Sequence, residues 1–324
     1  MAPPPPWPPA RRRRVGRTIL LLCLLLPVLL IAGGFAFGWV KFSQIPRVPV
    51  ASVLSPKAGS GTNILVVGTD SRDGINPGDP NADAFIGGGG ATGARTDSIM
   101  VLRIDGDQQS LLSIPRDLWV TDPSTGQLGR INSTYNAGAA NLITTVQNLG
   151  IPIHHYVEIN FVSFGKLVDA VGGIDVTFAN PSRDTASGLV IEEAGTHHLD
   201  GTQALAYVRS RHFEELKDGE WVEDPLSDLG RVARQRAFLS SLLTEVTSTK
   251  NPFELSSITD AMAVGMKIDD AMSFLDAIRL GWQFRGGFNP TSDTLPVTPR
   301  TTSGGAAVLD LNTNEAAPLI AQYQ

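Results

Sequence analysis

Cysteine is almost absent from this sequence of 324 residues: the single one, Cys23, lies within a long apolar run. The rest of the chain can therefore form no internal disulfide, and it offers no thiol nucleophile and no cysteine ligand for a metal. Two enzyme motifs are also missing, the phosphate-binding GxxxxGK[ST] loop and the GxSxG nucleophile elbow. The histidines stand as two adjacent pairs and one single residue, not four apart as in a helical zinc site. We expect them to be structural; they are His154, His155, His197, His198 and His212.

Charge is missing from residues 18–40, a run of 23 residues that is almost entirely apolar. A helix of that length crosses a hydrocarbon core of about 30 Å. A cleaved signal peptide is the alternative, but its apolar core would be only about 7–15 residues long. The run is longer, and Trp39 and Lys41 at its end are typical of a membrane interface. We therefore expect an uncleaved transmembrane helix.

The flanks of this run set the expected topology. Residues 1–17 are rich in proline and arginine. Because basic residues beside a span mark its cytoplasmic side, we interpret the arginines as a topology signal and not as a nucleic-acid contact. Residues 41–61, rich in Pro, Ser and Gly, are expected to form a stalk, and residues 62–324 one extracytoplasmic domain. The expected product is a single-pass protein of the cell membrane with a cytoplasmic N-terminus.

Apolar periodicity favours an α/β fold for this domain. Strands are expected at 63–68, 98–105, 110–115, 155–160, 174–178, 294–299 and 306–312, the second and third joined as a hairpin. Helices are expected at 136–150, 161–173, 200–208, 228–246 and 257–282. Because strands and helices interleave, the sequence predicts a single sandwich domain with a mixed central sheet flanked by helices.

The charge balance makes the arginines conspicuous. Five of the 26 Lys and Arg residues precede residue 18, whereas all 32 Asp and Glu residues follow residue 40, so the chain beyond residue 40 carries a net charge of −11. Each arginine alone is most simply a surface ion pair. Five of them nevertheless stand at the expected ends of strands, helices and loops: Arg95, Arg116, Arg209, Arg211 and Arg231. Since a guanidinium binds phosphate through two parallel hydrogen bonds, the set indicates a cationic patch suited to a pyrophosphate.

The spacing of these residues supports that interpretation. Arg95 and Asp97 are two residues apart in an extended segment, so they point to the same side. Arg209 and Arg211 have the same spacing but follow an expected helix, on which they would diverge by about 200°. They project together only if that helix has already ended.

Two further polar positions accompany the arginines. Gln235 lies four residues after Arg231 and shares its helix face. Asp70 follows the first strand of the domain, as Asp97 begins the second. Carboxylates beside a phosphate site make sense if a divalent cation lies between them, and Mg²⁺ is commonly held by one or two carboxylates plus phosphate oxygens. The sequence therefore predicts Mg²⁺ (or Mn²⁺) at Asp70 and Asp97.

In their order along the chain, the motifs resemble those of the LytR-CpsA-Psr family of bacterial cell-wall ligases. The resemblance covers residues 63 to about 245. It rests on the motifs NILVVGTDSRDG, RTDSIMVLRID, LLSIPRDLWV, INSTYNAGA, GIPIHHYVEINFVSFGKLVDAVGGIDV, LDGTQALAYVRSRH and DLGRVARQRAFL. It implies transfer of a glycopolymer from an undecaprenyl-pyrophosphate carrier to the 6-hydroxyl of muramic acid in peptidoglycan, outside the membrane. It also implies an apolar tunnel for the lipid tail, between the sheet and the helices.

The resemblance further implies a role for each candidate residue. The phosphates are held by Arg116, Arg209, Arg211 and Arg231, with Arg95 and Gln235 in support. Asp97 of the RTD motif binds Mg²⁺, with Asp70 as a second acid beside it. Arg116 and the two acids are the expected catalytic residues, and either Asp97 or Asp70 accepts the proton of the attacking hydroxyl.

Two other functions use the same residues. One is a polyprenyl-pyrophosphate pyrophosphatase, in which water replaces the sugar hydroxyl. The other is a non-enzymatic protein that binds the lipid carrier or regulates its use. A composition rich in Ala, Arg, Pro and Gly indicates an actinobacterial source and thus arabinogalactan as the polymer, with teichoic acid and capsule as alternatives.

Overall fold

A computed structural model describes the chain from residue 33 to residue 324, with gaps. The residues outside it are 1–32, 70–95, 226–229, 231–233, 235–236, 239, 243, 247–251, 285–286 and 289. The chain forms two compact units, Met1–Gln44 and Ile45–Gln324. In the first unit residues 33–43 are helical, while most of the expected span at 18–40 lies outside the described residues. Among the residues that the structure describes, no helix combines the length and apolar character that a membrane span needs.

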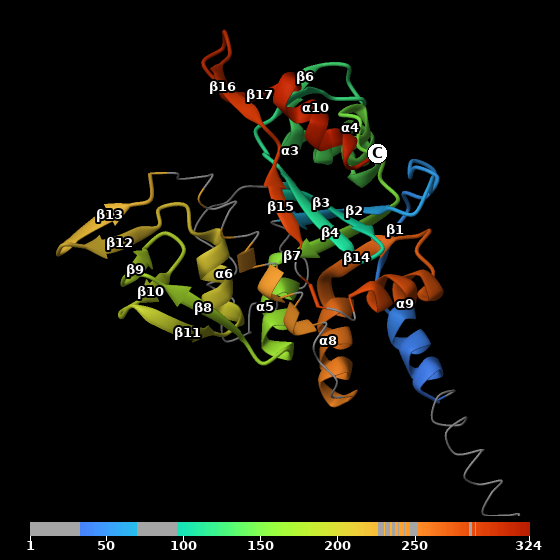
Figure 1. Ribbon diagram of the computed structural model, residues 1–324, viewed down its shortest axis with the longest axis horizontal. Helices are drawn as coiled ribbons and strands as arrows, with labels where there is room; N and C mark the ends of the chain where they lie inside the picture. Colours follow the sequence, from blue (N-terminus) through green and yellow to red (C-terminus); the bar gives the residue numbers. More distant parts are fainter. Residues whose placement is uncertain are drawn as a thin grey trace, which may run out of the picture. The chain divides into compact units, whose positions relative to one another are not determined.

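The second unit is built on a mixed sheet of seven strands (Figure 1). In spatial order they are β1 (Arg47–Val48), β14 (Met266–Asp269), β7 (His155–Asn160), β2 (Thr62–Thr69), β3 (Thr96–Asp105), β4 (Gln108–Ile114) and β15 (Thr291–Thr294). The central strand β2 runs parallel to β7 and antiparallel to β3. The expected hairpin is present as the antiparallel pair β3–β4. The prediction of an α/β fold with a mixed central sheet is confirmed.

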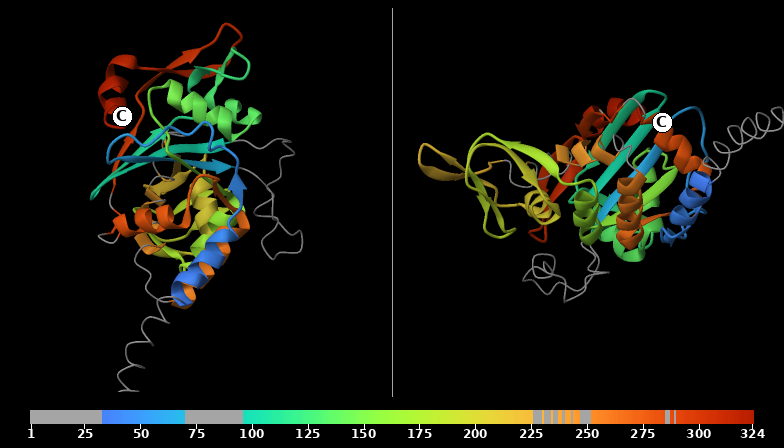
Figure 2. Two further views of the ribbon diagram at one scale, coloured as in Figure 1. Left: turned by 90° about the vertical axis from the view of Figure 1, so that its right-hand side faces the viewer. Right: turned by 90° about the horizontal axis from the view of Figure 1, so that it is seen from below.

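Both faces of this sheet are covered. Successive side chains of a strand point to opposite faces, and the central strands carry apolar side chains on both. On β2, Leu65 and Val67 face one core cluster, whereas Ile64 and Val66 face another. The first cluster packs under α4 (Ala139–Asn148) and α10 (Thr313–Ala321), and the second reaches α9 (Phe274–Gln283). Figure 2 shows α4 and α10 on one side of the sheet and α9 on the other.

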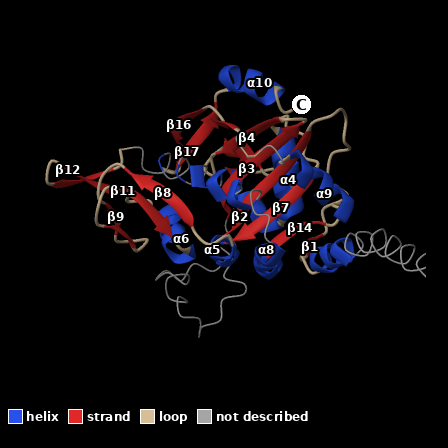
Figure 3. Ribbon diagram, turned by 60° about the horizontal axis from the view of Figure 1, so that its bottom comes forward, coloured by secondary structure: helices blue, strands red, loops and turns tan. Residues whose placement is uncertain are grey.

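A third core cluster lies among the helices beside the sheet. It joins α5 (Phe161–Ala170), α6 (Gly201–Arg209), α8 (Pro252–Gly265) and the helical residues described between 230 and 246. Two small antiparallel sheets complete this part: β8 (Ile174–Phe178) with β11 (Gly195–Leu199), and the order β10 (Leu189–Ile191), β9 (Ser182–Asp184), β12 (Glu214–Lys217), β13 (Glu220–Glu223). Figure 3 shows α6, α5 and α8 following one another along the lower edge of the main sheet.

Several short elements remain, most of which contribute to the core cluster that packs under α4 and α10. They are β5 (Trp119–Thr121), β6 (Leu128–Arg130), α3 (Ile131–Thr134), the 3₁₀ turn η1 (Tyr135–Ala137), β16 (Val297–Thr301) and β17 (Ala307–Leu311). Strands β5 and β6 pair with each other, as do β16 and β17.

Two expectations from the sequence are corrected. The helix expected at 257–282 is interrupted by strand β14, which pairs with β1 and β7. The neighbouring strands of the sheet supply backbone hydrogen-bond partners for β14. A new helix, α9, then begins after its N-cap Ser273, which forms a reciprocal capping box with Asp276. Part of the expected stalk at 41–61 belongs to the folded unit, because β1 joins the sheet and Val50 is buried in the core.

Candidate functional site

Three polar segments meet at one end of the central sheet. Thr69, the last residue of β2, pairs with Thr96 at the start of β3 and with Asn160 at the end of β7. All three side chains are buried. Asp70 follows Thr69 directly and Arg95 precedes Thr96, but both lie outside the described residues.

Arg116 and Asp97 belong to the same sheet end. The last pair of the β3–β4 ladder is Ile99↔Ile114, so Asp97 lies two residues before this pair on β3, and Arg116 lies two residues after it, just beyond the end of β4. The Asp117 carboxylate contacts Arg116 Nε at 3.5 Å and Arg130 Nε at 3.1 Å. The carbonyl of Arg116 accepts a hydrogen bond from the backbone N–H of Asn132 at 3.1 Å. The arginine is thus held from both its side chain and its backbone.

The two arginines of the RSR segment leave helix α6 in one turn. Asp200 caps the start of this helix through a reciprocal capping box with Gln203, and Arg209 is its last residue. Ser210 has φ −57° and ψ 120°, which are not helical values, so Arg211 lies beyond the helix. The condition under which Arg209 and Arg211 project together is therefore met.

A buried carboxylate holds this turn in place. Asp184, 1% exposed at the end of β9, accepts three hydrogen bonds on Oδ2: from Ser210 Oγ at 2.7 Å and from the N–H groups of Arg211 and His212 at 2.9 Å each. Its Oδ1 accepts two more, from backbone N–H groups at 2.8 and 3.2 Å. Burial alone would raise the pKa of Asp184, but the hydrogen bonds, led by that of Ser210, outweigh it and lower the pKa.

A second residue holds the same turn from the other side. Arg234 donates from Nη2 to the Ser210 carbonyl at 2.9 Å and from Nη1 to Asp224 Oδ2 at 2.7 Å. Its guanidinium lies over the ring of Phe213, 4.6 Å from the centroid, and its side chain is only 10% exposed. Asp224 in turn donates its backbone N–H to the carbonyl of Phe213 at 2.7 Å. Arg234 therefore positions the peptide between the two candidate arginines.

A buried polar network lies two residues from the end of β7. Glu158, 3% exposed, accepts hydrogen bonds from the hydroxyls of Tyr135 at 2.7 Å and Tyr156 at 3.0 Å. Its other oxygen contacts Lys267 Nζ at 3.0 Å. Burial and the neighbouring carboxylate raise the pKa of Tyr156, so its hydroxyl stays protonated and donates. The network ties the INSTYN segment to the sheet end.

The structure brings the candidate residues into two groups. Arg209 and Arg211 share one turn, and Asp97 and Arg116 share one end of the sheet. Asp70, Arg95, Arg231 and Gln235 lie outside the described residues, and for Asp97 only the backbone position is described. Within the described part of the chain, no three His, Cys, Asp or Glu side chains gather closely enough to hold a metal. Convergence of the two groups on one anion therefore stays a prediction.

Sequence reasoning missed three supporting residues, Asp184, Arg234 and Glu158. Arg234 stands three residues after Arg231 in the motif DLGRVARQRAFL, and Glu158 stands in the motif GIPIHHYVEINFVSFGKLVDAVGGIDV. For Glu158 the signal is its inward position in the alternating strand HYVEIN. The histidines all make contacts within the protein, among them His154 Nδ1, which accepts the backbone N–H of Asn63 at 2.9 Å.

Comparison with known proteins decides the assignment. The LytR_cpsA_psr family model matches residues 42–322. This chain belongs to the LytR-CpsA-Psr family. The resemblance seen in the motifs is thereby confirmed, and the match includes the sheet end, the turn after α6 and both residues that hold it.

Individual members of the family agree with this assignment. "Probable cell wall biosynthesis protein LcpB" of Corynebacterium glutamicum is 35% identical over 263 residues, 79% of this chain and 59% of that protein. "Polyisoprenyl-teichoic acid–peptidoglycan teichoic acid transferase TagU" of Enterococcus faecalis is 35% identical over 202 residues, 60% of either protein. This chain thus spans about three-fifths of the length of these relatives. The solved "LytR-Csp2A-Psr enzyme from Actinomyces oris" superposes with a TM-score of 0.64 at 28% identity, covering 86% of this chain and 95% of that one.

Proposed function

We propose that this protein is a phosphotransferase that moves a glycopolymer from an undecaprenyl-pyrophosphate carrier to muramic acid of peptidoglycan. Family membership supports the proposal, as do the names of the relatives: LcpB is named for cell-wall biosynthesis and TagU for teichoic acid transfer. The E. faecalis relative is named as acting on a polyisoprenyl-linked polymer and peptidoglycan, and those are the two substrate classes proposed for this chain.

The observation that carries the proposal is the turn after α6. Two guanidinium side chains leave this turn one residue apart, on a backbone fixed by buried Asp184 and by Arg234. A fixed backbone matters because preorganised donors stabilise charge that develops on a leaving phosphate without having to reorganise during the reaction. Arg209 and Arg211 are thus suited to bind one diphosphate, with Arg116, Arg231, Arg95 and Gln235 as the further donors.

The proposed metal site uses Asp97 and Asp70. Thr69 Oγ1, at the junction of β2 with Asp70, is buried and finds no hydrogen-bond partner among the described residues. A buried oxygen that has no partner among the described residues, and that directly precedes Asp70 in the sequence, suits a hard divalent cation, which prefers oxygen ligands. When bound, Mg²⁺ or Mn²⁺ would neutralise charge on the pyrophosphate oxygens.

The chemical step can be written with the residues of this chain. The muramic acid hydroxyl attacks the phosphorus that carries the glycopolymer, and the bond to the lipid phosphate breaks. Asp97 or Asp70 accepts the hydroxyl proton, and the arginines neutralise the leaving polyprenyl phosphate. In the pyrophosphatase alternative, water takes the place of the hydroxyl at the same phosphorus.

The proposal includes the location. The apolar run at 18–40 would anchor the protein in the cell membrane, with the N-terminal arginines in the cytoplasm and the sheet domain outside. A substrate whose carrier is a membrane lipid requires such an anchor or another means of reaching the bilayer surface.

The test uses the full chain in lipid nanodiscs with a labelled, lipid-linked glycan and peptidoglycan fragments. Arabinogalactan, teichoic acid and capsule precursors are offered separately. Arg209→Ala should lower kcat/KM at least about tenfold, because a charge-assisted hydrogen bond contributes about 1.5–3 kcal/mol. The matched control is Arg300→Ala, which removes an exposed arginine paired with Asp310 outside the site.

The outcomes separate the candidate functions. Labelled glycan on the peptidoglycan fragments supports the transferase. Release of phosphate with no labelled acceptor would favour the pyrophosphatase. If Arg209→Ala leaves both turnover and lipid binding intact, the catalytic mechanism built on the arginine turn is refuted.

A further inference from the structure

Helix α9 is apolar on two opposite sides. At about 100° per residue, Leu280 and the following Phe284 lie on one side and pack against the core cluster on the sheet. On the other side Leu275, Ile278 and Trp282 are 51%, 42% and 66% exposed. We call these three residues the α9 stripe. A continuous row of large exposed apolar side chains marks an interaction surface, unlike apolar residues scattered singly.

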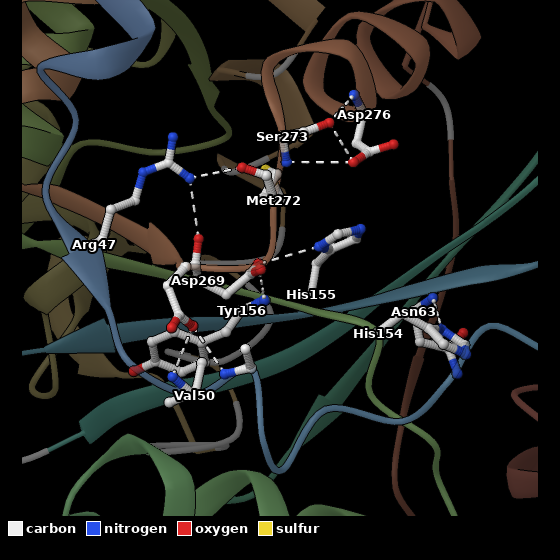
Figure 4. Close-up of polar contacts among 12 residues, drawn as sticks. Arg47, Val50, Asn63, His154, His155, Tyr156, Asp269, Met272, Ser273 and Asp276 are labelled. Atoms are coloured by element: carbon white, nitrogen blue, oxygen red, sulfur yellow. Dashed lines mark hydrogen bonds and ion pairs between the residues drawn. The ribbon is translucent and has the colours of Figure 1, made fainter.

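The start of α9 is clamped to strand β1. Arg47 of β1 donates from Nη1 to the carbonyl of Asp269 at 3.1 Å and to that of Met272 at 2.7 Å (Figure 4). The next residue, Ser273, is the N-cap of α9. The helix therefore begins at a point fixed by an arginine of the first strand in the sheet domain.

A second set of bonds makes this junction rigid. Asp270 Oδ1 accepts the backbone N–H groups of Val50 and Ala51 at 3.0 and 2.8 Å. Asp269, fully buried, contacts His155 Nδ1 at 3.1 Å and accepts the N–H of Tyr156 at 3.0 Å (Figure 4). Strand β14 is hydrogen-bonded to β1 on one side and to β7 on the other. The sheet therefore fixes the point at which α9 begins.

Only a short stretch of chain connects this junction to the apolar run at 18–40. Residue 40, the end of that run, precedes Arg47 by seven residues, which even when fully extended span at most about 25 Å. Met272 is held by Arg47, and α9 itself is about 15 Å long. If the run spans the membrane, α9 cannot lie far from the bilayer surface.

We propose that the α9 stripe lies in the outer interface of the membrane, with lipid as its occupant. Tryptophan favours the headgroup level, where its ring is apolar and its N–H stays wet, and Leu275 and Ile278 reach the acyl boundary. Arg279, whose side chain is 75% exposed and contacts Asp276 Oδ1 at 3.3 Å, lies about 40° around the helix from Leu275, at the margin of the stripe, where its guanidinium can reach lipid phosphates. The inference rests on the anchor in the proposed function and adds a second contact, which fixes how the domain is oriented on the membrane.

The test places an environment-sensitive fluorophore at one position at a time in the full chain. Cys23→Ser removes the native thiol, and Ile278→Cys provides the labelling site. The control is Val190→Cys, an equally simple change at a 65% exposed aliphatic residue on β10. Each labelled chain is incorporated into nanodiscs with or without a nitroxide-bearing phospholipid, and incorporation is checked by size exclusion.

The probe at position 278 should shift to the blue and lose fluorescence with the nitroxide lipid, whereas the probe at 190 should do neither. Adding Leu275→Gln and Trp282→Gln should remove the quenching at 278 while the thermal unfolding temperature stays unchanged. Absent quenching at 278, or equal quenching at both positions, would overturn the inference. A blue shift without quenching would mean that protein covers the stripe, which also overturns it.

Failures of the two proposals can be told apart. A chain that does not enter nanodiscs refutes the anchor and this inference together. A chain that enters them without quenching at 278 refutes only the α9 contact. Glycan transfer, measured separately on the same preparation, reports on the enzyme proposal alone.

Discussion

Asp184→Asn is the substitution that tests most directly how the arginine turn is built. The carboxylate accepts three hydrogen bonds on Oδ2, from residues 210–212, and two on Oδ1, from residues 186 and 187. An amide has one oxygen, so its NH₂ must face donors on one side. The amide should place its NH₂ toward the Oδ1 side, where two bonds are lost instead of three.

The magnitude follows from these lost bonds. Hydrogen bonds to a charged group contribute about 1.5–3 kcal/mol each, so two of them amount to about 3 kcal/mol at the low end. The three remaining bonds also lose their charge assistance. A free energy of unfolding near 5–15 kcal/mol is typical, so the variant should be clearly destabilised. The turn would then be less well fixed, and kcat/KM for the lipid-linked substrate should fall.

The assay is urea unfolding at pH 7 together with a pH series. Because the folded pKa of Asp184 is lowered, its stabilisation is present above the ordinary carboxyl value of 3.8 and is lost as pH falls through the folded pKa. The difference between wild type and Asp184→Asn should therefore be constant above pH 5 and shrink below 3.8. The control is Asp175→Asn, a 69% exposed carboxylate that contacts His198 and should leave stability unchanged. Equal stability of wild type and Asp184→Asn at pH 7 would refute this account of the turn.

Three further predictions concern other contacts. Arg234→Lys keeps the charge but loses the planar fork that bridges Asp224 and the Ser210 carbonyl. The free energy of unfolding in urea should fall by about 1–3 kcal/mol, and KM for the lipid-linked substrate should rise. An unchanged KM would contradict the positioning role. His154 accepts a backbone N–H through Nδ1, and burial first of all lowers its pKa, so stability should be full above pH 6.5 and fall as pH drops below it. A His154→Asn variant, which can accept the same bond, should lose that pH dependence; a slope equal to that of wild type would exclude His154 as its source. Asp97→Ala should abolish the dependence of transfer on Mg²⁺ or Mn²⁺, and an unchanged metal titration would rule out this residue as a ligand.

The fold was largely predictable because its main signals are local. Apolar segments of strand length placed β2, β3, β4 and β7, and Gly106 supports the expected hairpin with a positive φ of 59°. Strand β14 was missed because MKID is short and its partners, β1 and β7, lie far away in sequence. The S-x-x-D signature at 273–276 inside the expected helix was the available sign of a break.

The candidate site also contains residues that the local sequence predicts and residues that it does not. Arg209 and Arg211 could be found from their spacing, and the end of the helix between them follows from local conformation at Ser210. Asp184 could not be found, because nothing in its sequence neighbourhood indicates a partner 26 to 28 residues later. Asp184 positions the arginine turn through tertiary contacts, which leave no periodic trace in the sequence, unlike the inward position of Glu158 on its alternating strand.

The pairing of the sheet edges has a consequence for how the domain is made. Arg47 of β1 is bonded to a residue 222 positions later, and β15 meets β4 at a separation of 181. A nascent or exported chain that emerges N-terminus first has β2, β3, β4 and β7 long before their outer neighbours exist. Until residues 266–294 follow, β7 and β4 present open hydrogen-bonding edges, which invite pairing with other chains. The growing chain is therefore open to mispairing at those edges until its last strands form, and fragments ending before β14 should aggregate.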